Sequence, residues 1–189
     1  MTKNLALAAI QAALLVAARS AGAAPEPVQT SVVLHVKDCD HVPSRQLAEA
    51  ERLVSDVYAT GGVTIVWTDG AAPLAVPDGR FHADVFILNL DQTQRKHPEP
   101  AAFGQASHIT RRAYVYYGRI LQHAVRTGGD PAIALAVVLA HEVGHVLMPE
   151  AGHADSGLMR ATWEGRLATV PALTTAEAAS ISLAVRSLN

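Results

Sequence analysis

The feature that most constrains this fold is the apolar run at residues 132–140, AIALAVVLA, which HEVGH follows without a break. Asp130 and Pro131 precede the run, and this pair is typical of a helix start, with aspartate as N-cap and proline in the first turn. Pro149 cannot continue a helix, so we expect the helix to end just before it. A helix that is apolar on all sides has no face for water. We therefore expect it to lie packed under a sheet.

Two histidines and a glutamate lie in the last turns of this expected helix. His141 and His145 are four residues apart, which places both side chains on one face, where they can bind one metal ion. Glu142 lies beside the first histidine and would reach a metal-bound water more readily than the metal, as a general base does. Zinc suits these donors and lowers the pKa of a bound water from about 15.7 toward 7. The motif thus predicts a catalytic zinc site.

A catalytic zinc site usually has a third protein ligand, and the sequence offers two candidates. His153 follows His145 by eight residues and comes directly after Gly152, which permits a sharp turn back toward the metal. Glu164 follows His145 by nineteen residues and would complete a site of two histidines and a distant glutamate. Its surroundings, WEGR, have a poor helical pattern, which argues against that arrangement. We favour His153 and keep Glu164 as the alternative.

The first 23 residues have the pattern of a secretory signal peptide. Lys3 supplies the positive start, an apolar run spans residues 5–18, and small residues stand at 21–23. The apolar run is shorter than the roughly 20 residues that span a bilayer. We therefore expect a signal peptide at 1–23, one catalytic domain at 24–189, a secreted or periplasmic location, and no stable membrane insertion after cleavage.

Composition limits the partners and the covalent chemistry of the chain. Half of the 189 residues are hydrophobic, which is enough for one substantial core. Without residues 1–23 the chain has 13 basic and 17 acidic residues, a formal charge of minus 4, so nucleic acid is excluded as a partner on charge grounds. Cys39 is the only cysteine, so no intramolecular disulfide can form. We expect a partly buried thiol there rather than a thiolate that blocks the zinc.

Hydrophobic periodicity and turn residues predict the remaining elements. We expect strands at residues 31–36, 63–67, 83–90, 101–109 and 113–117, helices at 44–59 and from Thr174 to the C-terminus, a short helical turn at 119–126, a solvated loop at 91–100 and an irregular segment at 160–173. The run at 83–90 is apolar enough to lie in the middle of the sheet with both faces covered. Gly104 interrupts the run at 101–109, which suits a short edge strand.

These motifs together resemble the metzincin metalloproteases, most closely the matrixin-like branch, over residues 31–188. The resemblance rests on HEVGH in a buried helix, a third histidine after a glycine, ADSGLM, and a last helix opened by LTTAE. The family pattern places its glycine three residues, and its third histidine six residues, after the second histidine. This sequence departs from that pattern, because Met148 stands at the position of the glycine and His153 comes two positions later.

The resemblance implies an α+β, zincin-like fold with a mixed five-stranded sheet, a long active-site helix and a C-terminal helix. It also implies a role for each residue that matches the motif. Zn²⁺ would be held by His141, His145 and His153, with Glu142 as general base and Met159 in a methionine turn under the metal. The substrate cleft would be lined by an edge strand formed by Gly104, Gln105, Ala106 and Ser107.

We therefore expect a zinc-dependent endopeptidase that works as a monomer on peptide or protein substrates, with Glu142 activating a zinc-bound water. Two alternatives stay open at this point. One is a catalytically silent, zinc-stabilised binding module of the same fold. The other is a gluzincin-type peptidase with Glu164 as the third ligand. In either peptidase, we expect the specificity pocket to be formed by the segment around 163–170.

Two groups of side chains are ambiguous in the sequence. Tyr114, Tyr116 and Tyr117 fit strand packing, but any one of them could stabilise an oxyanion near the zinc, and the sequence does not select among them. His82 and Asp84 could hold a second metal, but such a pair is common where a strand begins, and we do not expect a structural metal there.

Overall fold

The computed structural model describes residues 30–70, 79–148 and 152–188. The signal peptide expected at 1–23 lies outside these residues. Within the described part of the chain, no helix is both long enough and apolar enough to cross a membrane.

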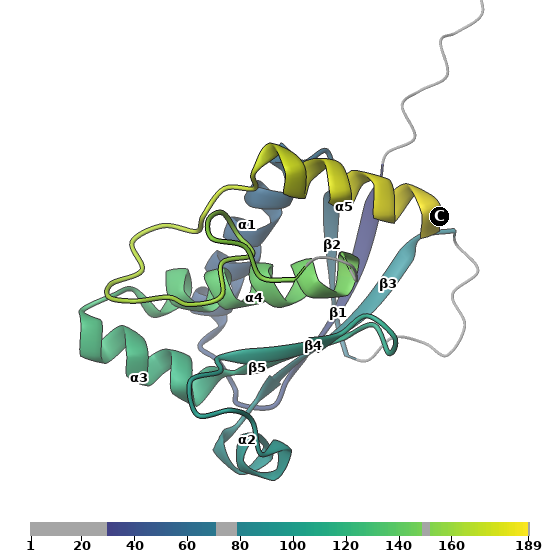
Figure 1. The fold of residues 1–189 in the computed structure, drawn as a ribbon. Helices are drawn as coiled ribbons and strands as arrows, with labels where there is room; N and C mark the ends of the chain where they lie inside the picture. The colour runs from purple at the N-terminus through teal and green to yellow at the C-terminus, as the bar shows by residue number, and fades with distance from the viewer. Residues whose placement is uncertain (1–29, 71–78, 149–151, 189) are drawn as a thin grey trace, which may run out of the picture.

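The described residues contain one five-stranded sheet with the strand order β2-β1-β3-β5-β4 (Figure 1). Its strands are β1 (Ser31–Asp38), β2 (Thr64–Asp69), β3 (Phe81–Leu88), β4 (Gly104–Ser107) and β5 (Arg112–Tyr116). The four strands β2, β1, β3 and β5 are parallel, and β4 pairs antiparallel with β5 at the end of the sheet. The expected mixed sheet, with the third strand in its middle and an edge strand at Gly104, is therefore confirmed.

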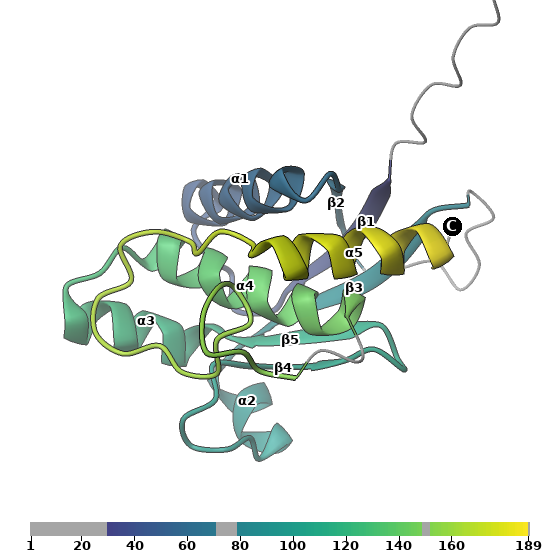
Figure 2. The same cartoon turned by 45° about the horizontal axis from the view of Figure 1, so that its top comes forward.

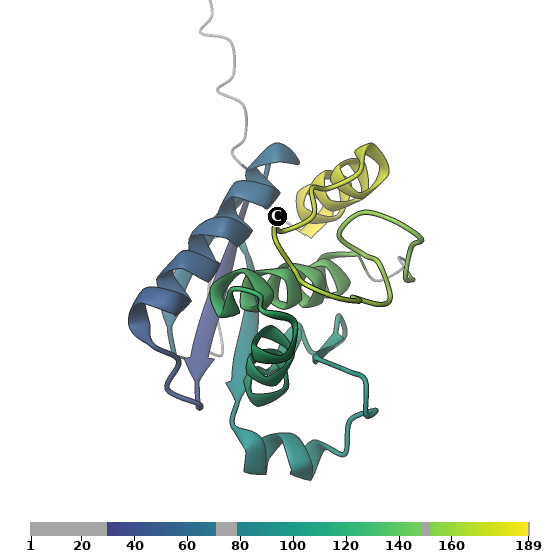
Figure 3. The same cartoon turned by 90° about the vertical axis from the view of Figure 1, so that its left-hand side faces the viewer.

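Five helices accompany the sheet in the described chain: α1 (Ser44–Thr60), α2 (Leu90–Lys96), α3 (Tyr117–Thr127), α4 (Pro131–Leu147) and α5 (Thr175–Leu188). Figures 2 and 3 show α4 at the centre of the molecule, with α1, α3 and α5 around it and the strands β4 and β5 beside it. Residues 152–174 form a long segment without helix, part of which passes in front of α4 (Figure 1).

Helix α4 is buried along nearly its whole length, as its apolar sequence predicts. Asp130 caps its start, because the carboxylate accepts a hydrogen bond of 2.7 Å from the Ala132 amide. At the other end, Met148 takes the C-cap position. The hydroxyl of Tyr58 on α1 donates a buried hydrogen bond of 2.8 Å to the Ala140 carbonyl. This contact holds α4 against α1 one residue before its first histidine.

One face of the sheet forms the core, and the other face is more open. Alternate residues of β1 and β3 point into the core with α1 and α4, including Leu34, Val85 and Ile87. On the opposite face of β3, Asp84 and Phe86 are partly exposed. The expectation that both faces of this strand are covered is therefore wrong. The strand begins at Phe81, and its burial alternates as far as Ile87. Phe86 is apolar but lies on the outer face, where it stacks on Tyr114, so a run of apolar residues did not mean that both faces are covered.

Two expected connections are in fact helices. The predicted loop at 91–100 contains α2, which Asn89 starts with a capping box. The Asn89 side chain accepts from the Gln92 amide, and the Gln92 side chain accepts from the Asn89 amide. The expected helical turn at 119–126 is the eleven-residue helix α3, which ends at Gly128 in the left-handed conformation. The remaining long segment, at 160–173, is irregular as predicted.

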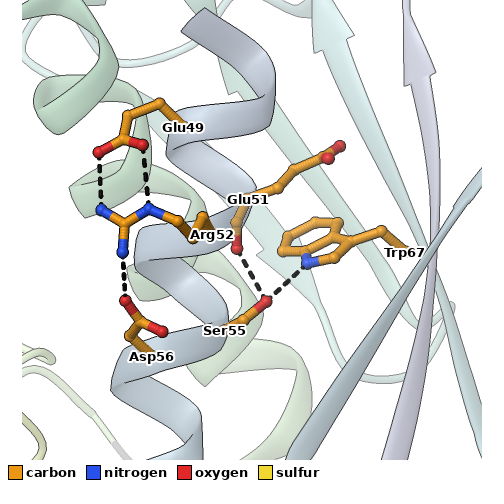
Figure 4. A network of polar contacts seen from close by, with 6 residues as sticks. All are labelled: Glu49, Glu51, Arg52, Ser55, Asp56 and Trp67. Atoms are coloured by element: carbon orange, nitrogen blue, oxygen red, sulfur yellow. Dashed lines mark hydrogen bonds and ion pairs between the residues drawn. The ribbon is translucent and has the colours of Figure 1, made fainter. Parts of the chain in front are cut away.

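Helix α1 has polar contacts along its exposed surface and a polar contact with the sheet (Figure 4). Arg52 forms ion pairs with Glu49 and Asp56 along the exposed helix surface. Exposed pairs of this kind contribute little to stability. The Ser55 hydroxyl accepts a hydrogen bond of 2.8 Å from the indole of Trp67 on β2, which fixes the helix against the sheet.

Candidate metal centre and active site

Three histidine side chains come together at the end of α4. His141 and His145 lie on the helix, and His153 follows after the segment 149–151, which is outside the described residues. The Nε2 atom of His145 is 3.1 Å from that of His141 and 3.3 Å from that of His153. One nitrogen of each ring lies within 4.8 Å of the other two.

This geometry fits a zinc ion. Zinc–nitrogen bonds of about 2.0–2.1 Å in a tetrahedral site place the ligand nitrogens about 3.3–3.4 Å apart. Both measured Nε2 separations are close to that spacing, and three neutral imidazoles are a donor set that zinc accepts. In the described residues this is the one group of three or more histidine, cysteine or acidic side chains that could hold a metal. The structure thus brings together the three residues that the sequence motif named.

The chemical state of His141 is set by its surroundings. Its Nδ1 atom lies 2.9 Å from the Leu158 carbonyl, and because a carbonyl can only accept, Nδ1 carries the proton. Nε2 is therefore left with a lone pair toward the other histidines. Burial lowers the pKa of His141 below its usual value, which also favours the neutral, metal-binding form. A carbonyl in this position orients a ligating histidine and increases its basicity.

Glu177, at the start of α5, holds the turn that carries this carbonyl. Its buried carboxylate accepts hydrogen bonds from the amides of Met159, at 2.8 Å, and Leu158, at 3.4 Å. It also completes the expected capping box with Thr174. The sequence showed the capping box but not the contact with the turn, because that contact depends on how α5 packs against residues 158 and 159.

Met159 lies against the metal-binding helix, as expected for a methionine turn. It is 1% exposed. A Cβ atom added to Gly144 would be 2.5 Å from the Met159 sulfur, which real side chains do not allow. Gly144, inside HEVGH, is therefore the residue that lets the methionine pack directly against α4.

Glu142 is buried between α4 and the edge strand. A Cβ atom added to Gly104 on β4 would be 2.5 Å from Oε1 of Glu142. Burial raises the pKa of the Glu142 carboxyl to about 8. A carboxyl with a pKa near neutrality can both take and release a proton at physiological pH, which is the requirement for a general base that later acts as an acid.

The structure also distinguishes the three tyrosines. Burial is the main cause that raises the pKa of the Tyr116 hydroxyl. The charge of Glu142 raises this pKa further. The Tyr116 hydroxyl donates a hydrogen bond of 3.3 Å to the Gln105 side chain. Tyr117 instead accepts a hydrogen bond from Gln46, and Tyr114 stacks on Phe86. Of the three, Tyr116 is the one whose pKa the charge of Glu142 raises.

Strand β4 is in the position expected for a substrate strand. Gly104, Gln105, Ala106 and Ser107 form the last strand of the sheet, paired with β5 on one side. The strand also packs against α4, which carries the histidines. An edge strand in this position has backbone groups available to pair with an extended peptide.

A cavity of about 790 Å³ lies next to His141 and Glu142. The segment after Met159 forms one wall, as expected for a specificity pocket, with Trp163 packed edge-on against His141 at a ring distance of 6.1 Å. Helix α3 forms another wall through polar side chains, among them Arg119, His123 and Arg126. That contribution was not predicted, because the sequence showed only a short helical turn there.

Other candidate ligands do not join the histidines. Glu164 lines the same cavity but is not part of the three-histidine group. Cys39 lies at the end of β1, partly buried, with its thiol directed to the Lys37 carbonyl. His82 has its Nδ1 atom 2.9 Å from Nε2 of His35, and the two rings stack. Asp84 pairs with Arg112 at 3.6 Å.

Comparison with solved structures shows that the fold is shared with an archaemetzincin and with a zinc-dependent peptidase. Archaemetzincin from Methanopyrus kandleri superimposes with a TM-score of 0.53 and 16% sequence identity, over 85% of this chain and 99% of that chain. A zinc-dependent peptidase from Methanocorpusculum labreanum gives a TM-score of 0.50 and 16% identity, over 79% and 99% of the two chains. The expected α+β, zincin-like architecture is confirmed, while the matrixin-like branch stays a prediction. The sequence matches no protein-family model and no curated protein.

Proposed function

We propose that this chain is a zinc-dependent peptidase that hydrolyses internal peptide bonds. The observation that carries the proposal is the convergence of three imidazoles, two of them from HEVGH, beside a buried glutamate at the edge of a sheet. Shared architecture with two zinc-dependent peptidase folds supports it.

Each residue of the site has a defined part in this reaction. His141, His145 and His153 would hold Zn²⁺ through their Nε2 atoms. When bound there, zinc supplies Lewis-acid activation of water and of the substrate carbonyl. Glu142 accepts a proton from the attacking water and later donates it to the leaving amine nitrogen. Strand β4 binds the peptide in an extended conformation through its backbone, so that the scissile bond lies beside Glu142.

The test is peptide hydrolysis by residues 24–189 loaded with zinc, together with the Glu142→Gln variant. We expect the wild-type protein to cleave members of a mixed peptide library. The variant should lose at least about 100-fold in rate, because the proton-transfer group is gone, while it keeps about one zinc per chain. A zinc-loaded wild-type protein that cleaves no library member would contradict the proposal and favour a binding module of the same fold.

We also propose that the chain is exported and that residues 1–23 are removed. The apolar run at 5–18 and the small residues at 21–23 support this. N-terminal sequencing of the protein secreted by an expression host should begin at residue 24. A mature protein that keeps its first residues and stays inside the cell would contradict it.

A further inference from the structure

The cavity beside the histidines is lined by two arginines from α3. Arg119 and Arg126 contribute to its wall, together with His141 and Glu142 at the metal side. Such a charge pattern next to a reacting centre determines which substrate groups can enter. This inference rests on the proposed peptidase function and concerns its substrate class.

Arg126 is held in place by a neutral histidine. Its Nη2 atom lies 3.2 Å from Nδ1 of His123, and Nε2 of His123 lies 2.9 Å from the Gly165 carbonyl. An arginine can only donate and a carbonyl can only accept, so His123 must carry its proton on Nε2 and accept from Arg126. The buried His123 ring also packs edge-on against Phe103, at a ring distance of 5.1 Å. Through His123, the Arg126 guanidinium is thus connected to Gly165 on the segment after Met159. Its remaining N–H groups can donate hydrogen bonds to a ligand.

Arg119 is fixed by backbone carbonyls. Its Nη1 atom donates hydrogen bonds to the carbonyls of Glu99, at 2.6 Å, and Ala102, at 2.7 Å. Its guanidinium also lies 5.5 Å from the ring centre of Tyr116. These contacts hold the guanidinium without neutralising its charge, because carbonyls carry none. An arginine positioned in advance loses less side-chain entropy when it binds a carboxylate.

The acidic residues at this cavity do not pair with the two arginines. Those among its lining residues are Glu142, at the metal side, and the exposed Glu164. In the described chain, neither arginine forms an ion pair with either glutamate. The cavity wall therefore carries two arginines that are held by neutral groups and keep their charge available.

We propose that this cavity binds a carboxylate of the substrate next to the scissile bond, with Arg126 and Arg119 as the groups that recognise it. Because the proposed reaction cleaves internal bonds, the carboxylate comes from an acidic side chain, and the free C-terminus of a peptide is the competing source that the experiment tests. Guanidinium groups bind carboxylates through paired hydrogen bonds, which neutral or cationic side chains cannot accept. The cavity lies beside Glu142, so the recognised group belongs to a residue adjacent to the cleaved bond.

The experiment uses sets of matched peptides in which one position holds Glu, Gln or Lys, and this position is moved along the peptide from set to set. Each peptide is made with a free C-terminus and with an amidated one. Cleavage by the zinc-loaded protein is followed by mass spectrometry, and binding is measured separately by fluorescence anisotropy. For one position flanking the cleaved bond, we expect kcat/KM to be about tenfold higher for Glu than for Gln, as a charge-assisted hydrogen bond allows. A preference that follows the free C-terminus and not the side chain would overturn the assignment to an acidic side chain.

Variants assign the preference to the arginines. Arg126→Gln should reduce the ratio of Glu to Gln substrates to nearly one, and Arg126→Glu should shift the preference to Lys. Arg166→Gln is the matched control. Arg166 is an exposed arginine that follows the cavity residue Gly165 in sequence, but it does not itself line the cavity. This control should keep the ratio of the wild-type protein. Thermal unfolding confirms that each variant is folded.

The outcomes separate this proposal from the proposed function. Cleavage without any preference for a carboxylate, or a preference that Arg126→Gln and Arg119→Gln leave unchanged, would overturn the cavity assignment and leave the peptidase intact. If no peptide is cleaved, the peptidase proposal fails. Binding then decides: tighter binding of the carboxylate peptides, lost in Arg126→Gln, still supports the cavity, and equal binding of all peptides overturns it.

Discussion

Gly104 is the residue whose absence of a side chain matters most at the candidate site. Its Cα faces the Glu142 carboxylate so closely that a Cβ atom would be 2.5 Å from Oε1. The buried glutamate can therefore keep its place only if this strand position is glycine. A displacement of about 1 Å in a catalytic group can cost about 100-fold in rate.

We expect Gly104→Ala to lower kcat/KM by about 100-fold while zinc content stays at about one per chain, because the change moves Glu142 and not the histidines. Gly118→Ala on α3 is the control, since a Cβ atom there would meet nothing within 4 Å. It should leave activity unchanged. Full activity in Gly104→Ala would show that Glu142 does not need its present position.

The buried Glu142 also gives the metal-free protein a dependence on pH. Its pKa is about 8 when folded, against an ordinary value of 4.5, so between these pH values the folded state binds more protons than the unfolded state. The free energy of unfolding should therefore fall as pH rises from about 4.5 to 8, by up to about 5 kcal/mol from this group. Below pH 4.5 the protonated Glu142 makes its full contribution to the free energy of unfolding, and above pH 8 this contribution is lost.

Urea unfolding of chelator-treated protein at pH 5 and pH 8.5 checks this expectation. Glu142→Gln is neutral throughout, so it lacks this dependence on pH. The variant should be similar to the wild-type protein at pH 5 and more stable by a few kcal/mol at pH 8.5. The same pH dependence in both proteins would mean that the glutamate is not buried as described.

Among the helices, α5 acts on the metal centre indirectly, through the Glu177 side chain. Glu177 binds the amides of Leu158 and Met159, and the Leu158 carbonyl accepts from His141. The helix therefore supports the site without touching it. Outer contacts of this kind change metal affinity by about 10- to 100-fold.

We expect Glu177→Ala to weaken zinc binding by about 10-fold or more, measured by competition with a chelator of known affinity. Ser182→Ala is the matched control on the same helix, because it removes a hydrogen bond of 2.7 Å to the Gly61 carbonyl that is not connected to the site. It should lower stability and leave zinc affinity unchanged. Equal zinc affinity in all three proteins would contradict the supporting role of Glu177.

Local patterns predicted the elements that depend on them. The all-apolar run and its Asp130 cap predicted the buried helix α4, and β-branched runs predicted the parallel strands. Helix α2 was missed because its start depends on a reciprocal pair of hydrogen bonds at Asn89, in a segment whose charges and prolines suggested a loop. The arginines of α3 and the turn contact of Glu177 could not be predicted, since they depend on packing between elements distant in sequence.

For the whole molecule, zinc should act as a stabiliser because the site is assembled from two separate segments. A ligand that binds only the folded state adds about 4 kcal/mol at a concentration about 1,000-fold above its dissociation constant. In a chain of this size that corresponds to a rise in Tm of roughly 10 °C. Differential scanning fluorimetry of the chelated protein with added zinc should show this rise.

Magnesium is the control for that measurement, because it prefers oxygen ligands and should leave Tm unchanged. His145→Ala should lose the response to zinc. A wild-type Tm that does not respond to zinc would mean that the histidines do not form a metal site in the folded protein.

The central claim is that His141, His145 and His153 together hold zinc. The most direct test is the zinc content of the purified chain, measured by inductively coupled plasma mass spectrometry for the wild-type protein, His153→Ala and Glu164→Ala. The structure predicts about one zinc per chain in the wild-type protein and in Glu164→Ala, and a loss of most zinc in His153→Ala. Zinc retained by His153→Ala and lost from Glu164→Ala would contradict the three-histidine site.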